Sequence, residues 1–135
     1  MEEKPDFPGA STCREYKDLL LQRSRGIVPA SIAQWLRDYQ VAGVEFMHFN
    51  FMKETGCILG DDMGLGKTIQ VIAFLTAAFG KTGDARDWKR MRKMRHEGRW
   101  YPKVVIICPG TLISNWKREL DTVSFCNHYR ERYRP

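Results

Sequence analysis

The sequence has few of the residues that build disulfide frameworks or zinc sites. Its four cysteines include no pair at CxxC spacing, and its three histidines lie at no ligand-like spacing from them. A structural zinc site is not expected, because such sites need four clustered Cys or His ligands. Cys57 and Cys108 lie within short apolar runs, which is typical of small buried side chains in a reducing compartment.

Long hydrophobic runs are also missing. The longest apolar stretches, residues 71–79 and 104–108, are well short of the roughly 20 residues that cross a bilayer. The first residues, MEEKPDF, are acidic and lack the basic-then-apolar order of a secretory signal. We therefore expect an intracellular chain without a membrane span. At 135 residues and 43% hydrophobic composition, it holds one globular domain at most.

The positive charge is concentrated in one block. Lysine and arginine number 22 against 16 acidic residues, a formal charge of +6. Residues 81–103 alone contain nine basic and three acidic residues, so this block accounts for the whole excess. Such a block suggests either a polyanion contact or a solvated insert.

Residues 1–59 are predicted to form an amino-terminal arm, two helices and a short strand. Residues 1–30 hold much of the early proline and glycine and predict a loosely attached amino-terminal arm. Apolar spacing predicts a helix from Ser31 and a second, largely buried helix over residues 38–53. The short apolar run at residues 57–59, between glycines, has the length of a buried strand.

A glycine-rich loop follows that strand. In DDMGLGKT, two glycines permit backbone angles that turn successive N–H groups inward toward an anion. Lys67 supplies charge for the β- and γ-phosphates, and the Thr68 hydroxyl is placed to ligate Mg²⁺ where a helix begins. The strict phosphate-loop pattern has glycine where this chain has Asp61. A glycine-rich turn that caps an ordinary helix is the alternative, but the flanking strand and helix favour nucleotide binding.

A second strand and helix are predicted downstream. Residues 103–108 form a continuous apolar run that ends at Pro109, as expected for an interior parallel strand. Thr111 can cap the next helix, residues 112–120, with Leu112, Ile113 and Trp116 facing inward. The alternation of strands and helices predicts an α/β fold with parallel strands and flanking helices.

Three segments are together similar to the amino-terminal motor lobe of Swi/Snf-type DNA-dependent ATPases of helicase superfamily two. They are LRDYQVAGVEFM (36–47), GCILGDDMGLGKTIQVIAFL (56–75) and VVIICPGTLISNWKREL (104–120). The flanking VPASI and ELDT resemble the excision-repair cross-complementing six-like proteins most. The resemblance implies a partial, truncated RecA-like P-loop lobe over residues 31–122, with a basic insert at 81–103 and an unmatched tail at 123–135.

The resemblance also implies roles for individual residues. Gln40 matches the glutamine that recognises adenine, although without the resemblance a solvated helix glutamine would be the simpler interpretation. Pro109, Gly110 and Thr111 match a loop that lies beside the DNA backbone. The phosphate and magnesium motif is matched by Asp61, Asp62, Met63, Gly64, Leu65, Gly66, Lys67 and Thr68.

These matches predict ATP and Mg²⁺ as cofactors, and duplex DNA, bound without sequence preference, as a partner. The expected location is the nucleus, with work in DNA repair or chromatin remodelling. Three interpretations of the basic insert stay open: a solvated surface loop, a DNA contact, and a nuclear-import patch. A non-catalytic nucleotide-binding fragment and, less favoured, a P-loop kinase are the alternative functions.

One motif that ATP hydrolysis needs in this superfamily is not found. No DExH or DExD sequence occurs in the 135 residues, and a second motor lobe is expected but absent. The segment Val123-Ser124 can be encoded by splice-donor-like bases, so we interpret the tail as intron read-through in a truncated gene model. With only two core strands, the polypeptide is expected to be marginally stable and prone to aggregate.

Overall fold

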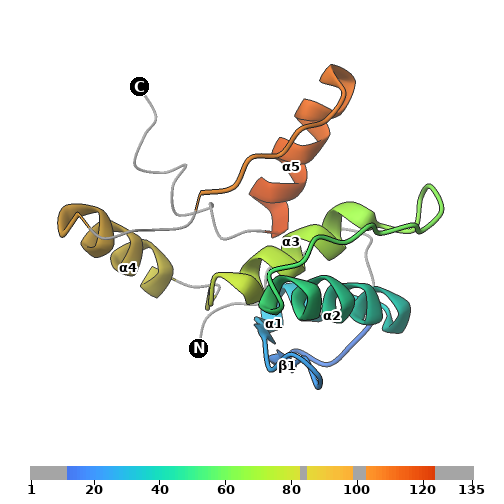
Figure 1. Ribbon diagram of the computed structural model, residues 1–135, viewed down its shortest axis with the longest axis horizontal. Helices are drawn as coiled ribbons and strands as arrows, with labels where there is room; N and C mark the ends of the chain where they lie inside the picture. Colours follow the sequence, from blue (N-terminus) through green and yellow to red (C-terminus); the bar gives the residue numbers. More distant parts are fainter. Residues whose placement is uncertain (1–11, 83–84, 99–102, 124–135) are drawn as a thin grey trace. The chain divides into compact units, whose positions relative to one another are not determined.

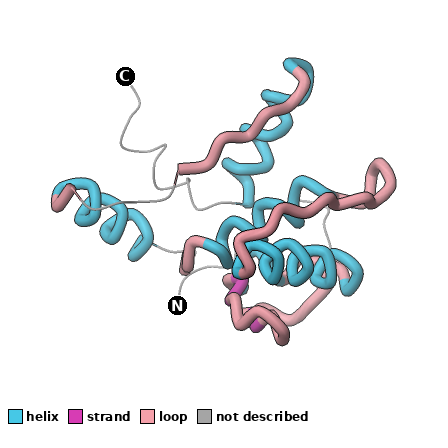
Figure 2. The backbone as a smooth tube through the Cα atoms, in the orientation of Figure 1, coloured by secondary structure: helices cyan, strands magenta, loops and turns pink. Residues whose placement is uncertain are grey.

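The computed structural model describes residues 12–82, 85–98 and 103–123 (Figure 1). The chain divides into two compact units, one formed by residues up to 81 and the other by residues from 82 onward. Both units are mainly helical, and the described ranges contain one two-stranded sheet (Figure 2). None of the helices in these ranges is long and apolar enough to span a bilayer.

A small antiparallel ribbon opens the first unit. Strand β1 (Leu19–Leu20) pairs with strand β2 (Ile27–Val28). The turn between them is closed by the Leu21 N–H, which donates to the Gly26 carbonyl at 2.8 Å. Leu21 and Val28 are fully buried, so the ribbon contributes to the core of the unit.

Residues 12–30 are attached to the helices that follow by backbone hydrogen bonds and by buried side chains of the ribbon. The backbone N–H groups of Cys13 and Arg14 both donate to the Gln34 carbonyl, at 2.8 and 3.1 Å. The expectation of a loosely attached arm is therefore wrong for these residues, because burying leucine and valine side chains of the ribbon stabilises their attachment. The boundaries of arm, lobe and tail stay predictions.

Two helices follow the ribbon, as the apolar spacing predicts. Helix α1 (Ala30–Ala33) is a single turn, and helix α2 (Asp38–Met52) is a full helix. Helix α2 buries one face in the core, but its Phe46 and Phe51 side chains are exposed. The expectation of a largely buried helix is therefore wrong in part, because the packing partners of α2 in the unit cover one face.

Helix α3 (Lys67–Ala78) begins directly after the glycine-rich loop and packs along α2 (Figure 1). Its position confirms the helix predicted after the loop. Ile72 is fully buried, and Ile69 and Leu75 are half-buried. The core of the unit includes Ile32, Leu36, Val44, Met47, Ile72, Ala73 and Ala77.

The two predicted core strands are not formed in the described residues. Residues 57–59 and 103–108 run as irregular segments, drawn as loops in Figure 2, and the sheet pairs only β1 with β2. Most of their side chains are exposed, with Ile58 at 89%, Val105 at 84% and Ile107 at 93%. The expected burial of Cys57 is also wrong, whereas Cys108 is partly covered. A strand requires a hydrogen-bonded neighbour, and apolar composition alone does not supply one.

The second unit contains helix α4 (Ala85–His96), the 3₁₀ turn η1 (Gly110–Leu112) and helix α5 (Ile113–Val123). The Asp87 carboxylate accepts hydrogen bonds from the Thr82 N–H at 2.9 and 3.0 Å, just before α4. Part of the basic block is therefore an ordered helix. Residues 124–135, which hold most of the predicted tail, lie outside the described ranges.

The predicted inward face of the last helix is wrong in part. Leu112 and Ile113 are exposed, and Trp116 is half-buried. Thr111 lies inside η1, and Pro109 precedes that turn without a side-chain cap, so the capping role predicted for Thr111 is also wrong. An apolar helical face is buried only where other apolar elements cover it.

Candidate nucleotide-binding site

The loop between residues 60 and 66 takes the tight turn that its glycines permit. Gly64 has a φ of 86° and Gly66 a φ of 75°, both in the left-handed region. A Cβ atom on Gly64 would meet nothing within 4 Å, so open space lies beside the loop. A Cβ atom on Gly66 would lie 2.5 Å from the Gln40 Nε2 atom. Gly66 is therefore required by both its backbone angle and its neighbour.

Lys67 is the first residue of α3 and folds back over the loop. Its ammonium donates to the Asp62 carbonyl at 2.7 Å and to the Asp61 carbonyl. The first N–H groups of any α-helix have no acceptor within the helix, and the helix dipole makes this end positive. The loop thus brings an ammonium and a helix N-terminus together, which is the arrangement that binds phosphate.

The first loop residue is anchored by a side chain that sequence reasoning missed. The Gln70 Nε2 atom donates to the Asp61 Oδ2 atom at 2.8 Å, and Gln70 is fully buried in α3. A Cβ atom on Gly43 of α2 would collide with the Gln70 Oε1 atom. The signal that could have found this contact is a glycine inside an apolar helix, which often marks the close approach of another group.

Gln40 joins the start of α2 to the glycine-rich loop. Its Oε1 atom accepts from the Arg37 N–H at 2.9 Å, and its Nε2 atom donates to the Leu65 carbonyl at 3.0 Å. The Tyr39 hydroxyl donates to the same carbonyl at 3.2 Å. Gln40 is only 6% exposed. An amide oxygen has two lone pairs and an amide nitrogen two protons, so one position on each atom is left for a further partner.

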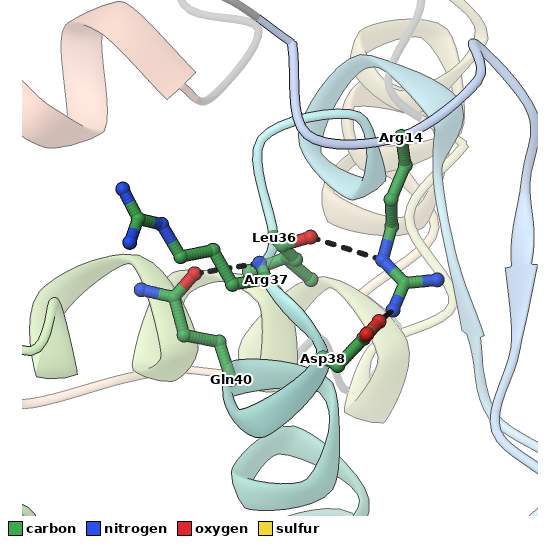
Figure 3. Close-up of polar contacts among 5 residues, drawn as sticks. All are labelled: Arg14, Leu36, Arg37, Asp38 and Gln40. Atoms are coloured by element: carbon green, nitrogen blue, oxygen red, sulfur yellow. Dashed lines mark hydrogen bonds and ion pairs between the residues drawn. The ribbon is translucent and has the colours of Figure 1, made fainter.

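Arg14 holds the same end of α2 from the other side, as Figure 3 shows. Its Nε atom donates to the Leu36 carbonyl at 2.9 Å, and its guanidinium forms an ion pair with Asp38. These contacts link the segment before β1 to the start of α2, whose first turn contains Gln40. Sequence reasoning missed Arg14 because its partners lie 22 and 24 residues away.

The structure brings the first group of predicted site residues together. Gln40 contacts the loop of residues 61–66, and α3 presents Lys67 and Thr68 directly after it. Met63 is 95% exposed at the loop, and Thr68 is half-buried in the first turn of α3. The arrangement can hold a phosphate chain against the loop, beside the Thr68 hydroxyl, the Lys67 ammonium and the Gln40 amide.

The other predicted site residues belong to the second unit. Pro109, Gly110 and Thr111 are exposed and lead through η1 into α5. An exposed loop with a glycine N–H and a threonine hydroxyl offers two hydrogen-bond donors to a phosphate oxygen. Their predicted role at a DNA backbone stays a prediction.

Comparison with known proteins identifies the family. The SNF2-related domain matches residues 39–128. The chain is 38% identical to the mouse DNA excision repair protein ERCC-6-like 2, over 89% of this chain and 8% of that protein. It is 48% identical to Switch 2 of Arabidopsis thaliana, over 68% of this chain and 10% of that protein.

A similar match is found in yeast. The DNA repair and recombination protein RAD26 of Saccharomyces cerevisiae is 31% identical over 85% of this chain and 8% of that protein. The chain spans about a tenth or less of the length of these three relatives. The resemblance drawn from the three sequence segments is confirmed: the chain belongs to the SNF2-related family of Swi/Snf-type, helicase superfamily two proteins.

Proposed function

We propose that this chain supplies the ATP-binding part of an ATP-driven DNA translocase of the Swi/Snf type that works in the nucleus. The observation that carries the proposal is the position of the Lys67 ammonium, folded over a glycine turn at the N-terminus of α3. Relatives named for DNA excision repair and for DNA repair and recombination support its assignment to repair or chromatin work.

The phosphates of ATP would lie against the loop of residues 61–66. Its left-handed glycines turn backbone N–H groups toward one side, and the space beside Gly64 is open. The Lys67 ammonium has three donors and can leave the Asp61 and Asp62 carbonyls for the β- and γ-phosphate oxygens. The Thr68 hydroxyl is the proposed Mg²⁺ ligand, since it follows the lysine at the helix start.

Gln40 is the proposed contact to the adenine ring. The open lone pair of its Oε1 atom would accept from the adenine amino group, and the open proton of its Nε2 atom would reach the neighbouring ring nitrogen. Its present hydrogen bonds to the Arg37 N–H and the Leu65 carbonyl support this role, because they fix the orientation of the amide. The same bonds would couple base recognition to the phosphate loop.

The finer fold proposed is a RecA-like lobe in which residues 57–59 and 103–108 become parallel strands. Exposed Ile58, Val105 and Ile107 side chains support it, because interior parallel strands carry continuous apolar runs that need cover on both faces. In such a sheet, ligands lie beyond the carboxyl ends of the strands. Both the phosphate loop and residues 109–111 follow such an end, and we propose that residues 109–111 contact the DNA backbone.

A second candidate is a nucleotide-binding segment that hydrolyses nothing by itself. It is favoured by one observation: the 135 residues contain no DExH or DExD sequence to hold Mg²⁺ and orient water. Membership in the SNF2-related family argues against the P-loop kinase alternative. We therefore propose ATP binding for the described residues and name no residue among them for the hydrolytic step.

The test is nucleotide binding and turnover by the 135-residue chain, with and without duplex DNA. A fluorescent ATP analogue reports binding, ADP release reports turnover, and Lys67→Ala is the matched variant. Binding that Lys67→Ala weakens supports the proposal, and DNA-stimulated ADP release supports its translocase part. Binding without turnover favours the second candidate. Phosphoryl transfer to a small acceptor, or no binding at all, would overturn both.

A further inference from the structure

Helix α4 carries most of its positive charge on one side, with Arg95 falling outside that side by position. Successive residues of an α-helix are rotated by about 100°, so side chains three and four positions apart share a face. By this rotation, six basic side chains fall within an arc of about 160°. All six are exposed: Arg86, Lys89, Arg90, Arg92, Lys93 and His96.

Two described positions of α4 outside this arc are covered at least in part. Asp87 is buried and accepts hydrogen bonds from Thr82, and Met94 is half-buried. A basic helix that binds a membrane surface needs an exposed apolar face to bury among the lipids. Among the α4 side chains that the structure describes, the exposed ones are all basic, so they are the surface that α4 offers to a partner.

The block of residues 81–103 contains too few acidic residues to balance its positive charge. Lys93 approaches Glu97 at 3.9 Å, but the Lys93 side chain remains 75% exposed. The block of residues 81–103 has nine basic and three acidic residues, so internal pairing still leaves a net charge of +6. The remainder of the chain is balanced, with 13 basic and 13 acidic residues. A surface with this charge density attracts a polyanion.

We propose that the basic face of α4 binds the phosphate backbone of duplex DNA. Four residues of helix rise span about 6 Å, so Lys89 and Lys93 can reach separate phosphates. Contacts of this kind position a protein on the duplex and read no sequence. The choice of DNA as the polyanion rests on the proposed function, whereas the binding surface itself rests on the charge and exposure of α4.

The test is the salt dependence of binding to a fluorescein-labelled DNA duplex. The 135-residue chain is compared with the triple variant Lys89→Gln, Arg92→Gln, Lys93→Gln. Each lost phosphate contact lowers the steepness of log affinity plotted against log salt concentration by about 0.9. The slope of the triple variant should therefore be shallower by up to about 2.7. Raising salt from about 50 to about 200 mM should then weaken the unmodified chain about 40-fold more than the variant.

The matched control removes the same charge elsewhere, through Lys17→Gln, Arg25→Gln and Lys53→Gln at exposed positions. This control should keep the original slope. Equal slopes for the α4 variant and the unmodified chain, or an equal loss in the control, would overturn the proposal. So would binding to vesicles containing phosphatidylserine that the α4 variant loses while its DNA binding is unchanged.

Magnesium-ATP binding separates this proposal from the nucleotide site. The α4 variant should keep its ATP affinity and the helical circular dichroism signal of the unmodified chain. A variant that loses DNA and ATP affinity together would overturn the assignment of a separate surface. Lys67→Ala should show the reverse pattern, with DNA binding kept and ATP binding lost.

Discussion

His48 is a buried titratable side chain in the core of the first unit. It is only 4% exposed, and a Cβ atom on Gly26 would lie 2.7 Å from its Cε1 atom. Burial lowers the pKa of His48 below its ordinary value of 6.5, and a hydrogen bond with the Ala77 backbone opposes this only in part. Burial therefore favours the neutral form of the imidazole in the folded chain.

This pKa predicts a loss of stability in acid. The unfolded chain binds the proton more readily than the folded chain, so the stability from His48 is complete above pH 6.5 and falls as pH drops through the lowered pKa. Apparent melting temperatures between about pH 7.5 and 5.5 should therefore fall less steeply for His48→Gln than for the unmodified chain. His96→Gln, at an exposed position, is the control. Equal slopes in the chain and in His48→Gln would contradict the prediction.

The packing of α2 on α3 depends on one glycine. Gly43 lets the fully buried Gln70 side chain lie against α2, where its Nε2 atom holds the Asp61 carboxylate at 2.8 Å. A methyl group at position 43 would push the amide away from this carboxylate. Gln70 therefore links the α2–α3 contact to the first residue of the phosphate loop.

Gly43→Ala should destabilise the chain by about 1–3 kcal/mol, because overpacking outweighs a gain of about 1 kcal/mol in helix propensity. In a Gln70→Ala background the same change should cost nothing or stabilise, since the collision is gone. The free energies of unfolding in urea of the unmodified chain, both single variants and the double variant together form a double-mutant cycle. Additive effects of the two substitutions would show that the contact is not formed.

The helices and the loop could be predicted from the sequence because their signals are local. The spacing of apolar residues located α2 and α3, and the glycines with Lys67 located the phosphate loop between them. The contacts of Gln70 and Arg14 were missed, because their partners lie up to 24 residues away and polar helix residues usually face solvent. The sequence around a lone glutamine in an apolar stretch does not indicate which residue it contacts.

Across the chain as a whole, the least accurate predictions concern the strands. Residues 57–59 and 103–108 have the composition of interior strands. Strand formation also requires pairing neighbours, which can lie far away in sequence and which composition does not supply. Exposed Val105 and Ile107 side chains form an apolar run of the kind that pairs with other chains. The expected tendency to aggregate therefore stays a prediction.

The central claim is that residues 61–68 hold the triphosphate of ATP. Titration calorimetry of the 135-residue chain with magnesium-ATP tests it most directly, beside Lys67→Ala with the same helical circular dichroism signal. We predict saturable heat at one site and an affinity at least about tenfold weaker in Lys67→Ala, since one lost charge-assisted contact is worth about 1.5–3 kcal/mol. No heat from the folded chain, or equal affinity in the two proteins, would contradict the account.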